Sequence, residues 1–240
     1  MAYAYQRTIF EQVAAGERPA TVSIIPSTRH VGVTRKDTLR RGFDRAVREA
    51  GEEGYPVLVR ASGGGATAAG PGTFGFSIIR PSEDARRGIN ERYDEAASLV
   101  LGAFLRLGIE AAEVGEVRDE FCPGDHSIRA GSFEDGMKLV GIAQRLTRRA
   151  TSVGGIVLVR GEAELARVLG RVYTALDLPF RPGSVGSLRR TGRIATVEEA
   201  IEALAEEAKL RYGATPVPVD EQTKELARIG RAECLVRPSA

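Results

Sequence analysis

Apolar residues recur at helical spacing in several stretches of the chain, most of which end at a glycine. Between residues 37 and 50 they repeat every four positions, which predicts an amphipathic helix that opens at Asp37 or Thr38. Thr196 with Glu199 forms a capping box in front of another apolar repeat. The predicted helices span residues 8–15, 37–50, 89–107 (the longest) and 162–176, and a further helix opens at Thr196.

Other stretches carry β-branched and apolar residues in short runs, which predicts strands. Glycines and prolines separate many of these runs, so the connections between them are expected to be short. The order of the elements predicts an α+β fold in which a mixed, mostly antiparallel sheet packs against helices. The predicted strands span residues 21–26, 30–34, 56–60, 73–79, 112–117, 125–129, 137–146 and 152–159.

The composition is that of a globular enzyme, with 42% hydrophobic and 28% charged residues. A chain of 240 residues suits one α/β core with a small appendage better than two full domains. No apolar run reaches the roughly 20 residues that cross a bilayer. The first residues carry no apolar core followed by a cleavage site, so we expect a cytoplasmic protein without a membrane partner.

Charge, cysteines and histidines exclude several other classes. The net charge is only +2 and the arginines are spread along the chain, so we expect no nucleic-acid partner. Two thiols, Cys122 and Cys234, give little basis for a disulfide in a cytosolic protein. The two histidines, His30 and His126, lack the paired spacing of a metal site, and we predict none.

A glycine-rich loop, Arg60-Ala-Ser-Gly-Gly-Gly-Ala66, joins two predicted strands. It matches neither the dinucleotide fingerprint nor the P-loop, because both of those lead into a helix. Three consecutive glycines let backbone N–H groups approach a ligand, and Arg60 adds a charge-assisted contact. A flexible hairpin connection explains the same glycines equally well.

Cys122 and Lys138 are the residues with the clearest reactive chemistry. Most lone cysteines are small buried hydrophobes, but Cys122 precedes Pro123-Gly124, and a bent loop there presents its sulfur. A nearby cation favours the reactive thiolate form of a cysteine. Cys234 has no such context.

Lys138 lies in a strand that is apolar on both faces, so its ammonium requires an anionic or carbonyl partner. Its alternative role is that of an exposed strand residue. Asp125 and His126 follow Cys122 closely, and two interpretations explain them equally well: orientation of the thiol, or the ordinary polarity of an exposed loop.

In order and spacing, the glycine loop, Phe74-Gly-Phe-Ser-Ile-Ile79 and Lys138-Leu-Val-Gly-Ile-Ala-Gln-Arg145 resemble the lipoate-protein ligase and octanoyltransferase family. That family shares its fold with biotin protein ligases. Its glycine-rich segment covers the acyl chain or acyl-adenylate, and its strand lysine contacts the reacting carbonyl. The resemblance implies catalytic roles for Cys122 and Lys138, and acyl or substrate binding by Arg60, Ser62, Gly63, Gly64, Gly65, Gly141 and Ala143.

The resemblance also implies a catalytic domain over residues 1–190 and a helical C-terminal extension over residues 191–240. The segment around Cys122 looks like the branch that uses cysteine for octanoyl or lipoyl transfer. We therefore predict an acyltransferase that takes the group from an acyl carrier protein or a lipoylated donor protein. The group would pass through a Cys122 thioester to a lysine of a lipoyl-domain acceptor, without a required cofactor.

Two alternatives remain. In an ATP-dependent lipoate-protein ligase, Arg60 and the glycine loop would hold lipoyl-AMP, ATP and Mg²⁺ would be required, and Cys122 would be a bystander. Gly154-Gly155, which stand where resembling ligases carry a His-Gly pair, depart from that pattern. The small residues of 68–72 depart from the transferase pattern and leave the acyl-chain length open. A non-catalytic lipoyl-binding adaptor is the second alternative.

Overall fold

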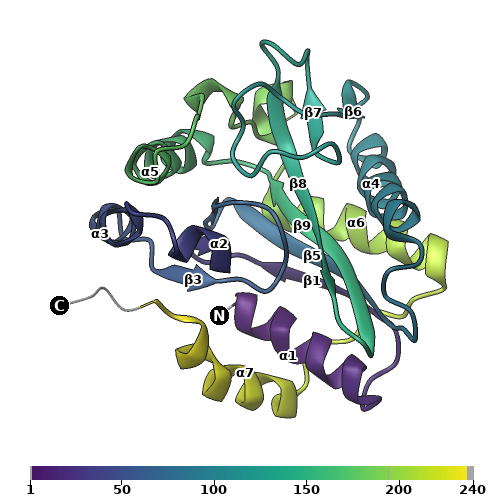
Figure 1. Ribbon diagram of the computed structural model, residues 1–240. Coiled ribbons are helices and arrows are strands. Elements are labelled where there is room, and N and C mark those ends of the chain that lie inside the picture. Colours follow the sequence, from purple (N-terminus) through teal and green to yellow (C-terminus); the bar gives the residue numbers. More distant parts are fainter. Residues whose placement is uncertain (1, 194, 237–240) are drawn as a thin grey trace.

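The computed structural model describes residues 2–193 and 195–236, which form two sheets surrounded by helices (Figure 1). The helices are α1 (Ala2–Ala15), α2 (Arg35–Thr38), α3 (Phe43–Glu52), α4 (Ile89–Arg106), α5 (Glu162–Ala175), α6 (Val197–Tyr212) and α7 (Glu221–Cys234). The strands are β1 (Thr21–Pro26), β2 (His30–Val33), β3 (Val57–Val59), β4 (Thr67–Ala69), β5 (Thr73–Pro81), β6 (Ala112–Val114), β7 (Ile128–Ala130), β8 (Met137–Leu146) and β9 (Ala150–Leu158). Short 3₁₀ turns cover Pro182–Ser184 and Leu188–Thr191.

The large sheet has the strand order β1-β5-β9-β8-β7-β6, and every neighbouring pair in it is antiparallel. The small sheet has the order β3-β2-β4, in which β2 and β3 run parallel. The prediction of an α+β fold with a mixed, mostly antiparallel sheet is confirmed.

Three apolar clusters join the helices to the sheets. Helices α4 and α6 pack together on one face of the large sheet, against β5, β8 and β9. Helices α3 and α5 cover the small sheet. Helix α1 packs on β1 and β5, and α7 lies along α1 (Figure 1). Within the described residues, no helix is both long and apolar enough to cross a membrane.

The prediction of one helix over residues 37–50 is wrong, because the chain breaks into α2 and α3. The cap of α2 is Thr34, which forms a capping box with Asp37. A Cβ on Gly42 would lie 1.7 Å from the carbonyl oxygen of Ala175, so the chain at Gly42 passes directly against the end of α5. The capping box of Thr196 and Glu199 opens α6 as predicted.

Candidate active site

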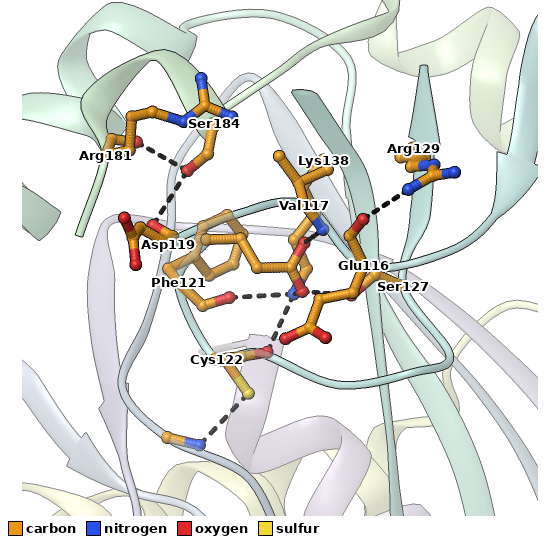
Figure 2. A network of polar contacts seen from close by, with 12 residues as sticks. Glu116, Val117, Asp119, Phe121, Cys122, Ser127, Arg129, Lys138, Arg181 and Ser184 are labelled. Atoms are coloured by element: carbon orange, nitrogen blue, oxygen red, sulfur yellow. Dashed lines mark hydrogen bonds and ion pairs between the residues drawn. The ribbon is translucent and has the colours of Figure 1, made fainter. Parts of the chain in front are cut away.

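The Cys122 thiol lies on the loop between β6 and β7, where it meets the glycine loop (Figure 2). Its sulfur accepts a hydrogen bond from the Gly65 N–H at 3.2 Å and another from Nη2 of Arg60 at 3.2 Å. The backbone of Cys122 has φ 46°, in the left-handed region that residues with a side chain rarely adopt. A cation and a backbone N–H therefore both face the sulfur.

Arg60 organises the glycine loop as well as contacting the sulfur. Its Nη1 donates to the Ser62 hydroxyl at 2.9 Å and its Nη2 donates to the Gly65 carbonyl at 2.6 Å. The N–H of Ala61 donates to the Tyr3 hydroxyl of α1 at 2.6 Å, which anchors the other side of the loop. The loop is thus ordered by side chains on both sides and is not a free hairpin connection.

Lys138 is 1% exposed on β8 and points to the back of the Cys122 loop (Figure 2). Its Nζ donates to Oε1 of Glu120 and to the carbonyl oxygens of Phe121 and Cys122, each at 2.9 Å. The anionic and carbonyl partners that its apolar strand required are therefore present. All three N–H groups of the ammonium are engaged, so contact with a substrate carbonyl requires one of these bonds to open.

Glu120 is a residue that the sequence analysis did not single out. It is 1% exposed, and its carboxylate accepts from the Ser127 hydroxyl at 2.6 Å and the Val117 N–H at 3.1 Å, besides Lys138. A buried lysine needs a buried anion, so an acidic residue beside the candidate nucleophile was the available signal.

A cavity of about 130 Å³ opens beside the thiol, between the two sheets and under α1. Glycines of β5, β8 and β9 are part of its lining, and a Cβ on Gly154 of β9 would lie 2.0 Å from the carbonyl oxygen of Phe76 on β5. Its walls include five of the predicted site residues, namely Arg60, Ser62, Cys122, Gly141 and Ala143. The other predicted residues, Gly63, Gly64, Gly65 and Lys138, are not part of the lining. Gly65 and Lys138 donate hydrogen bonds to Cys122, and Gly64 passes close to its sulfur.

Several polar side chains on the cavity wall were also missed. Nδ1 of His30 lies 2.8 Å from the carbonyl oxygen of Thr28, and because a carbonyl only accepts, this nitrogen carries the proton. Burial lowers the pKa of His30, so the ring is neutral at neutral pH and Nε2 is an acceptor. Gln6 and Tyr3 of α1 also line the cavity. Their positions depend on how α1 docks, which the sequence pattern does not reveal.

The other reactive side chains of the sequence analysis, His126 and Cys234, make their contacts away from the cavity. His126 stacks on Tyr93 of α4, with ring centroids 3.9 Å apart and planes 6° apart. Cys234 is buried on α7, where Nη1 of Arg7 lies 3.3 Å from its sulfur, and it is absent from the cavity lining. Among the described residues, no group of three or more His, Cys, Asp or Glu side chains is arranged to hold a metal ion.

The fold is that of lipoate-protein ligases. A putative lipoate protein ligase from T. acidophilum with bound lipoic acid matches at a TM-score of 0.70, with 20% identity over 96% of this chain and 89% of that one. A lipoate-protein ligase A bound with ATP matches at a TM-score of 0.71, with 20% identity over 96% and 88% of the two chains. Residues 1–209 match the model of the lipoyl protein ligase A/B catalytic domain, so the chain belongs to that family.

Curated relatives are protein acyltransferases of this family. An octanoyl-[GcvH]:protein N-octanoyltransferase of Bacillus velezensis is 29% identical over 221 residues, which are 86% of this chain and 75% of that protein. A lipoyl-[GcvH]:protein N-lipoyltransferase of Listeria monocytogenes is 28% identical over 200 residues, 78% of this chain and 69% of that protein. The predicted family is confirmed, and the chain is an enzyme of the lipoate-protein ligase family.

Proposed function

We propose that this enzyme moves an octanoyl or lipoyl group from a donor protein to a lysine of a lipoyl-domain acceptor, through a thioester on Cys122. The observation that carries the proposal is the thiol itself, which stands on the cavity wall with the Arg60 guanidinium and the Gly65 N–H both directed at its sulfur. The names of the relatives, which pair an octanoyl- or lipoyl-[GcvH] with a protein, support a protein-bound acyl donor.

In the first step the Cys122 thiolate attacks the acyl carbonyl, and the bond from that carbon to the donor breaks. A thioester donor leaves as its thiolate, whereas an amide donor leaves as an amine that takes up one proton. In the second step the acceptor amine attacks the Cys122 thioester, an amide forms, a proton is released and the thiolate returns. Because the Gly65 N–H and Arg60 already point at the sulfur, they can also reach the oxyanion on the adjoining carbon.

Lys138 contributes from the opposite side of the loop. It holds the Cys122 carbonyl at 2.9 Å, so the backbone that carries the nucleophile is tied to β8. The role implied by the family resemblance, contact with the reacting carbonyl, is compatible with this position if substrate replaces one loop carbonyl as acceptor. Gly141 and Ala143 of β8 then lie along the acyl chain in the cavity.

Intact-protein mass spectrometry tests this function. The protein is incubated with octanoyl carrier protein, and separately with octanoyl-GcvH, without ATP. We expect the mass of one octanoyl group on wild type and on Cys234→Ala, which removes the other thiol, and none on Cys122→Ala. The proposal is contradicted if neither donor gives an acyl-enzyme, or if Cys122→Ala still gains the mass of an octanoyl group. Acceptor acylation that requires ATP and Mg²⁺ and persists in Cys122→Ala points to the ligase instead, and a tight acceptor complex without turnover points to the adaptor.

A further inference from the structure

Tyr173 joins the two loops that meet at Cys122. This tyrosine lies on α5 in the core over the small sheet and is 2% exposed. Its hydroxyl oxygen lies 2.6 Å from the backbone nitrogen of Cys122 and 2.8 Å from the carbonyl oxygen of Ala66, at the end of the glycine loop. One phenol therefore bridges the loop of the thiol and the loop of its hydrogen-bond donors.

The direction of both hydrogen bonds is determined by chemistry. Burial raises the pKa of Tyr173, so the phenol keeps its proton over the physiological range. The Ala66 carbonyl only accepts, and the phenol therefore donates its single hydrogen to it. The hydroxyl oxygen then accepts from the Cys122 N–H.

The backbone of Cys122 is held on both of its polar groups. The Tyr173 hydroxyl accepts a hydrogen bond from the Cys122 N–H, and the Lys138 ammonium donates one to the Cys122 carbonyl oxygen at 2.9 Å. A residue other than glycine at φ 46° persists only when its surroundings impose that conformation, because the left-handed region costs free energy. Both holding groups come from rigid elements, α5 and β8, and both are almost fully buried.

We propose that Tyr173 is a positioning residue for the acyl-transfer reaction. It acts with Lys138 as a clamp, the Cys122 clamp, that holds the cysteine in its left-handed conformation. In that conformation the sulfur faces the Gly65 N–H and Arg60 Nη2, both at 3.2 Å. The inference rests on the proposed function only in that Cys122 is taken as the nucleophile, because the geometry of the clamp is independent of the donor.

Tyr173→Phe tests the clamp, since it removes one oxygen and keeps the ring that fills the core. The matched control is Tyr55→Phe, which makes the same change at a tyrosine that is 1% exposed in the same apolar cluster. The Tyr55 hydroxyl is associated with Glu164 and Arg29 instead of the thiol. Two rates are measured for each protein, namely alkylation of Cys122 by iodoacetamide at pH 7 in a Cys234→Ala background and turnover with the acyl donor.

For Tyr173→Phe we expect both the alkylation rate and kcat to fall by roughly tenfold or more, with KM for the donor within about twofold of wild type. Tyr55→Phe should keep both rates. Wild-type rates in a folded Tyr173→Phe protein overturn the clamp, as does an equal fall in the control. If Tyr173→Phe does not fold, amide hydrogen exchange of wild type decides: slow exchange at Cys122 supports the clamp, and exchange at the rate of an unprotected amide overturns it.

The two proposals fail in distinguishable ways. Iodoacetamide needs no acyl donor, so the alkylation rates report on the clamp even if neither octanoyl carrier protein nor octanoyl-GcvH acylates the enzyme. An acyl-enzyme that forms normally in Tyr173→Phe, with an unchanged alkylation rate, removes the clamp and leaves the transferase proposal standing.

Discussion

The thiol of Cys122 fits beside the glycine loop because residue 64 has no side chain: a Cβ on Gly64 would lie 2.4 Å from Sγ. The same Cβ would lie 2.8 Å from Nη2 of Arg60, and Gly64 has φ +100°, a conformation that side chains disfavour. The glycine at position 64 is thus required by the nucleophile on the neighbouring loop, in addition to any approach by a ligand.

Gly64→Ala should therefore displace the sulfur from its two donors. Because a misplacement of about 1 Å can cost on the order of a hundredfold in rate, we expect acylation of Cys122 to slow by roughly that factor. Gly63→Ala is the matched control, since a Cβ there meets nothing within 4 Å. Rates of acylation are followed by intact mass, with thermal unfolding as the check on folding. Equal rates for the two variants would show that the loop yields to the added methyl group.

Glu120 and Lys138 form an ion pair in which both side chains are almost fully buried, at 0% and 1% exposure. Glu120→Gln leaves the ammonium without its counter-charge, and removing one partner of a buried pair typically costs about 3–5 kcal/mol. We expect a loss of that order in the free energy of unfolding, measured with urea. Glu134→Gln is the comparison, because its pair with Arg118 is more than half exposed and should contribute less than about 1 kcal/mol. If both variants lose a similar amount of unfolding free energy, the buried Glu120 pair contributes no more to stability than an exposed pair.

Much of the fold was predictable from local pattern, but the exceptions have tertiary causes. The capping box of α6 and the apolar repeat of α4 are properties of neighbouring residues, and the structure has both helices where they were predicted. The break between α2 and α3 depends on Gly42 passing the end of α5, more than 100 residues further along the chain. No periodicity within residues 37–50 records that contact.

The candidate site divides in the same way. Cys122, Lys138 and Arg60 stand out by residue type and setting, and in the structure both Arg60 and Lys138 contact Cys122. Glu120 and Tyr173 contact them across 18 and 51 positions of sequence, through a carboxylate and a phenol that also suit ordinary core or surface positions. Their roles follow only from three-dimensional contacts.

Ala143 lies on the cavity wall in β8, opposite Gly154 of β9. Ala143→Leu adds three carbon atoms to a cavity of only about 130 Å³, so it should exclude long acyl chains more than short ones. We expect the ratio of octanoyl to butanoyl transfer, each as kcat/KM, to fall by roughly ten- to a hundredfold. Ala163→Leu, on the exposed face of α5, should leave the ratio unchanged. If kcat/KM falls by the same factor for octanoyl and butanoyl transfer, the acyl chain does not lie along Ala143.

Asp220 caps α7 and pairs with Arg18, which follows α1. We expect this carboxylate to make the stability of the folded protein depend on pH. The Asp220 carboxylate caps α7 by accepting from the Thr223 N–H at 2.7 Å, and it also pairs with Arg18. Hydrogen bonds from Thr223 and the Arg18 charge lower the pKa of Asp220 from 3.8 to about 2. Because the folded state holds this proton less tightly than the unfolded state, the contribution is complete above about pH 4 and is lost as the pH falls toward 2.

Asp220→Asn separates the charge of that carboxylate from the cap, since asparagine also caps helices well. We expect wild type to be the more stable of the two at pH 7 and the difference in unfolding free energy to shrink between about pH 4 and pH 2. Asp220→Ala removes the cap as well as the charge, so it should be less stable than Asp220→Asn by about 1 kcal/mol over the same pH range. Glu221→Gln, at a neighbouring carboxylate that is 89% exposed, is the control. If the difference in unfolding free energy between wild type and Asp220→Asn stays constant from pH 7 to pH 2.5, the charge of Asp220 does not stabilise the fold.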